Sequence, residues 1–73
     1  MPQRETDELP WEQAVAQLES CNVAMAVQTH DLEVRLTLHD GSQVVAREPM
    51  IDEVFRVLDR TRQKCGMIPI ATE

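Results

Sequence analysis

Residues 32–41, LEVRLTLHDG, decide the fold. From Leu32 to Leu38 every second residue is leucine or valine, and the residues between them are charged or polar. This strict alternation predicts a strand with one buried face and one polar face. Asp40-Gly41 follows directly, and this pair tolerates the positive φ angles of a tight hairpin turn. The stretch therefore predicts a β-hairpin whose second strand covers residues 43–47.

On the N-terminal side, residues 23–29 alternate as well, and one face of this predicted strand carries only small or polar residues. Before it, Trp11, Ala14 and Leu18 recur at three- and four-residue steps, which is the period of a helix. We expect this helix to run from Pro10 to Ser20, with Asn22 as its left-handed stop.

On the C-terminal side, Glu48-Pro49 ends the hairpin and starts a second helix. Its apolar stripe recurs at helical spacing and ends at Gly66, a residue that suits a helix C-terminus. Residues 67–71 form a candidate short strand, which Pro69 confines to a sheet edge.

The predicted fold is α+β: a helix, a three-stranded antiparallel meander, a helix and a short fourth edge strand. A right-handed crossover places the last strand beside the first, in the order 4-1-2-3. We expect both helices on the leucine face of the sheet. Residues 1–8 are interpreted as a frayed acidic segment, and residues 9–73 as a single domain.

The opposite face of the sheet is then open, and it is the candidate surface for homodimerisation, with a sheet edge as the alternative. A second copy would add stability to a chain of only 73 residues. The residues expected on this dimer face are Ala24, Ala26, Gln28, Arg35, Thr37 and Val45.

Charge is the strongest indication of function. The net charge is −6, and residues 1–55 hold 11 acidic residues against 3 basic ones. Such a chain is repelled by phosphate, so we expect no direct binding to nucleic acid. The same field attracts a basic protein surface. The alternative is that the charge serves solubility alone.

No motif identifies a reaction, a cofactor or a metal. Gly41 and Gly66 are the only glycines, so a glycine-rich phosphate loop is excluded. The two cysteines and two histidines lack the close pairs of a zinc site. His39, Asp40 and Ser42 lie together, but a Ser after a tight turn is typical of turn chemistry. We therefore expect no enzymatic activity, no cofactor and no metal.

The N-terminus and the length of the apolar runs indicate the compartment, which in turn predicts the state of the cysteines. The N-terminus is polar and acidic, unlike a signal peptide, and no apolar run is long enough to span a membrane. We therefore expect the protein in the cytoplasm of a bacterium or of a phage-infected cell. There, Cys21 and Cys65 are expected as free thiols, with a disulfide between them as the alternative.

The predicted function is that of a small acidic, non-catalytic binding protein. It would act as an inhibitor or decoy on a basic, nucleic-acid-binding surface of a partner protein, where its carboxylates replace phosphates. In type alone, it is similar to phage inhibitors of bacterial defence, including anti-CRISPR proteins. The alternative is a homodimeric accessory or regulatory subunit that uses the open sheet face. The expected partner-binding residues are Glu5, Asp7, Glu8, Glu12, Glu19, Asp31, Glu33, Asp52 and Glu53.

Overall fold

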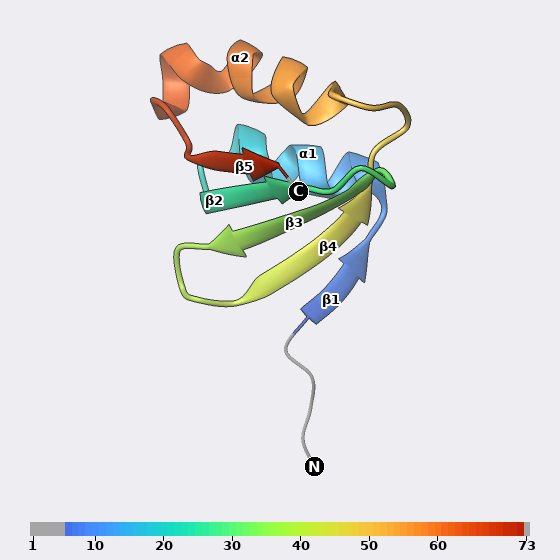
Figure 1. Cartoon of the computed structure of the whole chain (residues 1–73). Helices are drawn as coiled ribbons and strands as arrows, with labels where there is room; N and C mark the ends of the chain where they lie inside the picture. The colour runs from blue at the N-terminus through green and yellow to red at the C-terminus, as the bar shows by residue number, and fades with distance from the viewer. Residues whose placement is uncertain (1–5, 73) are drawn as a thin grey trace.

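The structure, a computed structural model, describes residues 6–72, in which two helices pack on one five-stranded mixed sheet. Figure 1 shows the arrangement. The elements in chain order are β1 (Thr6–Leu9), α1 (Trp11–Glu19), β2 (Val23–Gln28), β3 (Glu33–Leu38), β4 (Gln43–Arg47), α2 (Glu53–Cys65) and β5 (Ile70–Thr72).

The predicted hairpin and meander are confirmed. β3 pairs antiparallel with β4 on one side and with β2 on the other. The hairpin turns at Asp40-Gly41, where Gly41 has a φ of 91°. The Asp40 carboxylate accepts hydrogen bonds from the backbone N–H of Ser42 at 2.9 Å and from its hydroxyl at 2.6 Å. This local turn fixes the register of the two strands.

The two outer strands both run parallel to their neighbours. β5 lies beside β2, as the crossover rule predicted, and β1 lies beside β4 at the other edge. The sheet order is β1-β4-β3-β2-β5 (Figure 1). The predicted order of the four expected strands is confirmed, and β1 is an additional strand.

The strand β1 corrects the expectation of a frayed segment. Residues 6–8 pair with β4, whereas residues 1–5 lie outside the described part of the chain. The pairing runs in register from Thr6 opposite Gln43 to Leu9 opposite Ala46. Because Leu9 is its only apolar residue, β1 has no alternating pattern, and only its backbone pairing with β4 identifies it as a strand.

Both helices cover the same face of the sheet, as predicted. In the view of Figure 1, α1 lies behind the sheet, and α2 lies along the sheet edge formed by β5. They bury their apolar residues against the leucine face of the hairpin. The buried core consists of Ala14, Leu18, Val23, Ala26, Val34, Leu36, Val44, Ala46, Val54 and Val57.

A β-bulge in β2 reverses part of the predicted sheet face. Val23 is opposite Leu38 and Met25 is opposite Thr37, so Ala24 is an extra residue in the ladder. One extra residue moves every later side chain to the other face. Ala26 therefore lies in the core at 0% exposure, and Met25 lies on the open face at 43%.

The helix ends agree with the sequence only in part. α2 ends at Cys65, and Gly66 is its C-cap, as predicted, with a φ of 77°. After α1, however, the left-handed residue is Cys21, with a φ of 63°, and not Asn22. The N–H of Cys21 bonds to the Leu18 carbonyl and that of Asn22 to the Gln17 carbonyl, a Schellman motif. α2 begins at Glu53, later than expected, because residues 50–52 form a turn.

Candidate binding surface at the acidic end

Three segments meet at one end of the sheet, which we call the acidic end: the first turn of α1, the turn of residues 29–32, and residues 48–53, which lead into α2. Backbone and side-chain hydrogen bonds join the second and third of these segments. The N–H of Glu48 bonds to the carbonyl of Leu32 at 2.9 Å, and Arg47 Nη1 bonds to the Asp31 carbonyl at 2.7 Å. The acidic residues of the acidic end are Glu12, Asp31, Glu48, Asp52 and Glu53.

Gln28 connects the sheet to the start of α2. Its side chain is buried, with 5% of the residue exposed. Its Nε2 donates to the Asp52 carboxylate at 3.1 Å, and its Oε1 accepts from the Asp52 backbone N–H at 3.0 Å. The sequence prediction that Gln28 belongs to the open face is therefore wrong, because the bulge turns it toward the helices.

Glu48 is the buried carboxylate of this end. Only 1% of the residue is exposed, and its Oε1 accepts a hydrogen bond from the N–H of Val54 at 2.9 Å. Asp52, although it is the cap residue of α2, makes no side-chain cap bond, so Glu48 takes this role. Oε2 is buried and has no hydrogen-bond partner among the described residues. Burial raises the pKa of the Glu48 carboxyl, and the nearby Asp52 charge adds to this.

Sequence analysis missed Glu48, although a signal was present. Val44 and Ala46 point into the core, and Glu48 continues the same two-residue period. The alternation therefore directs Glu48 inward, beneath the start of α2. A carboxylate at this position is stabilised by the positive end of the helix dipole.

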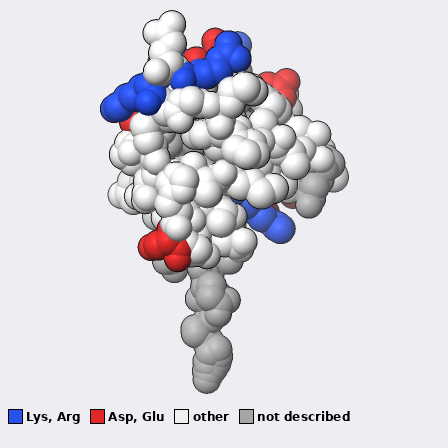
Figure 2. All heavy atoms as spheres, turned by 90° about the vertical axis from the view of Figure 1, so that its left-hand side faces the viewer, with Lys and Arg blue, Asp and Glu red and all other residues white. Residues whose placement is uncertain are grey.

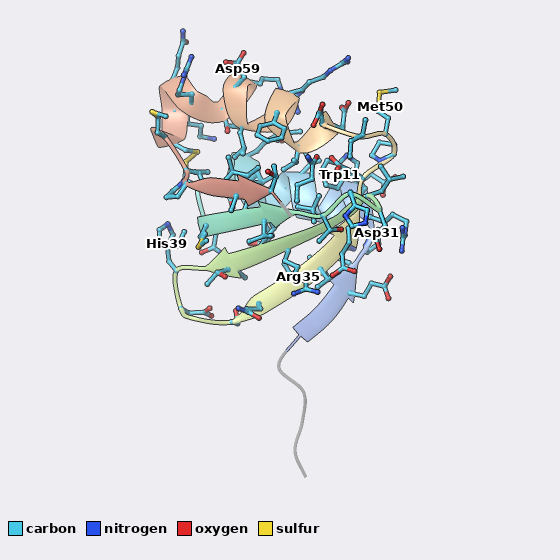
Figure 3. The ribbon with its side chains drawn as sticks, in the orientation of Figure 1. Trp11, Asp31, Arg35, His39, Met50 and Asp59 are labelled. Carbon is cyan, nitrogen blue, oxygen red and sulfur yellow. A yellow bond between two sulfur atoms is a disulfide. The ribbon has the colours of Figure 1, made fainter. Side chains whose placement is uncertain are left out.

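Asp31 is an exposed acid with a defined position. Its carboxylate accepts a hydrogen bond from the hydroxyl of Thr29, and Arg47 lies nearby. The Thr29 hydroxyl, chiefly, lowers the pKa of the Asp31 carboxyl. Asp31 therefore remains charged under mildly acidic conditions and points outward from the turn (Figure 3).

The expected partner-binding residues are only partly brought together. Glu12, Asp31, Asp52 and Glu53 converge on the acidic end, and Glu8 and Glu33 lie on the open sheet face. Glu19 lies at the opposite end, where its carboxylate pairs with Arg60 at 3.2 Å. Asp7 belongs to β1, and Glu5 lies outside the described residues.

The open sheet face matches half of the predicted dimer surface. Arg35, Thr37 and Val45 lie on this face, and Ala24 occupies the bulge. Ala26 and Gln28 lie on the other side, so their assignment to this face was wrong. One row of the open face crosses all five strands: Glu8, Val45, Arg35, Val27 and Ala71.

At the other end of the molecule, which we call the stapled end, Cys21 and Cys65 form a disulfide with Cα atoms 5.2 Å apart. The expectation of free thiols is therefore wrong, and the alternative is correct. The two helices run side by side and finish at the same end of the sheet, which brings the cysteines together. Arg60, Arg62 and Lys64 lie in the last turns of α2, and Figure 2 shows Lys and Arg side chains gathered there.

The remaining chemistry-bearing residues form no further cluster. His30 and His39 are exposed on separate turns at opposite ends of the sheet. Within residues 6–72 no group of three or more His, Cys, Asp or Glu side chains could hold a metal ion. Neither helix of this part of the chain is long and apolar enough to cross a membrane.

Comparison of the sequence with known proteins does not place the chain in a family. No protein-family model matches the chain, and no curated protein sequence matches it.

Proposed function

We propose that this protein is a non-catalytic binding protein that docks its acidic end on a basic surface of a partner protein. One observation carries the proposal. Carboxylates from three separate segments, two of them helix starts, lie at one end of the sheet, while Arg60, Arg62 and Lys64 lie at the other. In addition to the net negative charge of the chain, the acidic and basic side chains are therefore separated along the molecule.

This separation of charge matters during encounter. Screening at physiological salt acts over about 8 Å, so only charges that lie close together act as one field. At the acidic end the carboxylates face Arg47 and Arg56 as the nearby cations. The remaining negative field orients the protein as it approaches a basic surface and raises the association rate.

The partner best suited to this end is the groove of a nucleic-acid-binding protein. Its Lys and Arg side chains are placed to meet a row of phosphates. Carboxylates fixed by a folded scaffold can occupy the same positions. The fixed Asp31 and the start of α2 supply such carboxylates. The protein would then act as a competitive inhibitor or decoy, as anti-CRISPR-type inhibitors do.

The test compares two double variants that make the same change in charge at opposite ends of the molecule. The double variant E12K/E53K changes the acidic end, and E19K/D40K makes the same change in charge at the stapled end. The probe is a fluorescent DNA duplex bound to a bacterial nucleic-acid-binding effector. We expect wild-type protein to displace the duplex at low salt, and E12K/E53K to lose most of this competition.

The control decides between position and net charge. E19K/D40K changes the hairpin turn, so circular dichroism first checks that it is folded; the folded variant should compete nearly as well as wild type, and competition should weaken steeply as salt rises. Equal loss for both double variants would show that only net charge matters and would overturn the proposal. No displacement from any effector of a basic-groove panel would also overturn it.

We further propose that the protein acts in the cytoplasm, and the Cys21–Cys65 bond makes this testable. Disulfides are rare in cytosolic proteins because the glutathione and thioredoxin systems reduce them. Rapid alkylation of thiols in intact host cells would report the state of the pair. A largely reduced pair supports the cytoplasm, and a fully oxidised pair contradicts it.

A further inference from the structure

An apolar groove lies between α2 and β5, at the sheet edge opposite β1. It has a volume of about 210 Å³ and is lined mainly by Phe55, Leu58, Met67, Ile68 and Ile70. Met67 is 80% exposed, the most exposed of the large hydrophobic residues that the structure describes. An apolar side chain so exposed beside an apolar groove favours a protein contact at this position.

The edge strand beside this groove lacks charge. β5 pairs with β2 through one edge, where the Pro69 carbonyl accepts a hydrogen bond from the Ala26 N–H at 2.9 Å. Because backbone groups alternate between the two edges of a strand, those of Ile70 and Thr72 point to the outer edge. The opposite edge strand, β1, carries the exposed Glu8, whose charge opposes strand addition. β5 is therefore the edge that suits pairing.

The rim of the groove is electrostatically complementary to itself. Asp59 and Arg62 lie on the groove side of α2, about one turn apart. Arg62 Nη2 is 3.4 Å from Asp59 Oδ1, so the two side chains form an ion pair. Both side chains are more than half exposed. When two α2 helices meet antiparallel across a two-fold axis, Asp59 of each copy faces Arg62 of the other. A two-fold interface requires this kind of reciprocal match.

We propose that this groove and the outer edge of β5 form the interface of a homodimer. The second copy pairs its β5 antiparallel with β5 of the first, so that the two sheets join into one. Met67 of each copy enters the groove of the other, a role that suits its flexible, unbranched side chain. Asp59 and Arg62 exchange their pair within one helix for two pairs between helices.

A second copy fits this surface better than an unrelated partner does. The chain carries a net charge of −6, so two copies repel each other through most of their surface. The groove carries one acid and one base, and none of the carboxylates of the acidic end lines it. In the dimer the two acidic ends point in opposite directions. Dimerisation therefore leaves the proposed partner-binding surface uncovered.

The experiment is a charge swap, read by sedimentation equilibrium over a concentration series of the full chain. We expect wild-type protein to dimerise reversibly. D59R and R62D should each weaken dimerisation by about tenfold or more, because like charges then face each other across the axis. A one-to-one mixture of D59R with R62D restores all the opposite-charge pairs, so it should form heterodimers.

Two charge-matched variants and a third on the open sheet face serve as controls. E12R and R56D make the same changes in charge on exposed residues that do not line the groove, and they should dimerise as wild type does. V45K changes the open sheet face and should also leave the dimer intact. Circular dichroism checks that every variant is folded.

Three outcomes would overturn the dimer. The first is a wild-type chain that is monomeric over the whole concentration range. The second is a D59R and R62D mixture that stays monomeric although each variant is folded. The third is a dimer that V45K abolishes and D59R does not, which would place the interface on the open sheet face.

Discussion

The two ends of the molecule are held by different means. At the stapled end a covalent bond joins Cys65, the last residue of α2, to Cys21, the left-handed residue that follows the cap of α1. At the acidic end, hydrogen bonds from Gln28 and Glu48 hold the loops, and a buried carboxyl lies beneath the start of α2. The comparison shows that one end depends on a bond that reduction can break, whereas the other depends on hydrogen bonds that reduction leaves intact. Like charges gathered at the acidic end are by themselves destabilising, so the hydrogen bonds of Gln28 and Glu48 must offset their repulsion there.

The largest expected effect is at the stapled end. C21S/C65S removes a cross-link between cysteines 44 positions apart, which chain-entropy arguments value at about 4 kcal/mol. We expect a loss of about 2–4 kcal/mol in the free energy of unfolding, measured with urea. Hydrogen exchange should accelerate first at the helix C-termini. An unchanged urea midpoint would show that the bond contributes little to stability.

The next effect is at the acidic end. E48A leaves the N–H of Val54 without its hydrogen-bond acceptor and opens a cavity under α2. We expect a loss of about 1–3 kcal/mol in urea unfolding. E12A, in the first turn of α1 but exposed, should change stability by less than about 0.5 kcal/mol. Equal losses for the two variants would contradict the role of Glu48 as a cap.

A smaller effect, the pH dependence of stability, distinguishes the contribution of the Glu48 charge from that of its hydrogen bond. The raised pKa of Glu48 means that the folded state binds this proton more tightly than the unfolded state does. The stabilisation is complete below about pH 4.5 and is lost as pH rises through the raised pKa. E48Q keeps the acceptor and removes the titration. Its stability should therefore exceed that of wild type increasingly as pH rises, and a constant difference from pH 4 to 7 would contradict this.

The smallest expected effect is on the stability of the protein at low pH. Hydrogen bonds from Thr29 and Ser42 chiefly lower the pKa values of Asp31 and Asp40, respectively. Their stabilisation is present above about pH 3.8 and is lost as pH falls through the lowered values. D31N tests the acidic end and D40N the stapled end. Each should make acid unfolding slightly less steep, which thermal melts between pH 2 and 5 would detect.

The sequence predicted the parts of the fold that local patterns decide. The alternation of residues 32–38 and the Asp40-Gly41 turn predicted the hairpin, and the helical spacing predicted α1 and α2. The crossover rule predicted that the last strand lies beside the first strand of the meander. These features need only neighbouring residues or a general rule of topology.

The candidate site was less predictable. The sequence identified carboxylates by type, but it could not say that Glu12, Asp31, Asp52 and Glu53 converge while Glu19 lies at the other end. Convergence depends on which ends of the strands and helices meet. That is a property of the sheet order and not of any single segment.

The sequence by itself determined the α+β class, the hairpin register, the Gly66 cap and the acidity of the chain. Only the tertiary structure decided the pairing of β1, the side-chain direction after the Ala24 bulge, the burial of Glu48 and the disulfide. The physical reason is the distance along the chain over which each interaction acts. Periodicity and turn chemistry act over a few residues, whereas backbone pairing, bulges and cross-links join segments far apart in the chain.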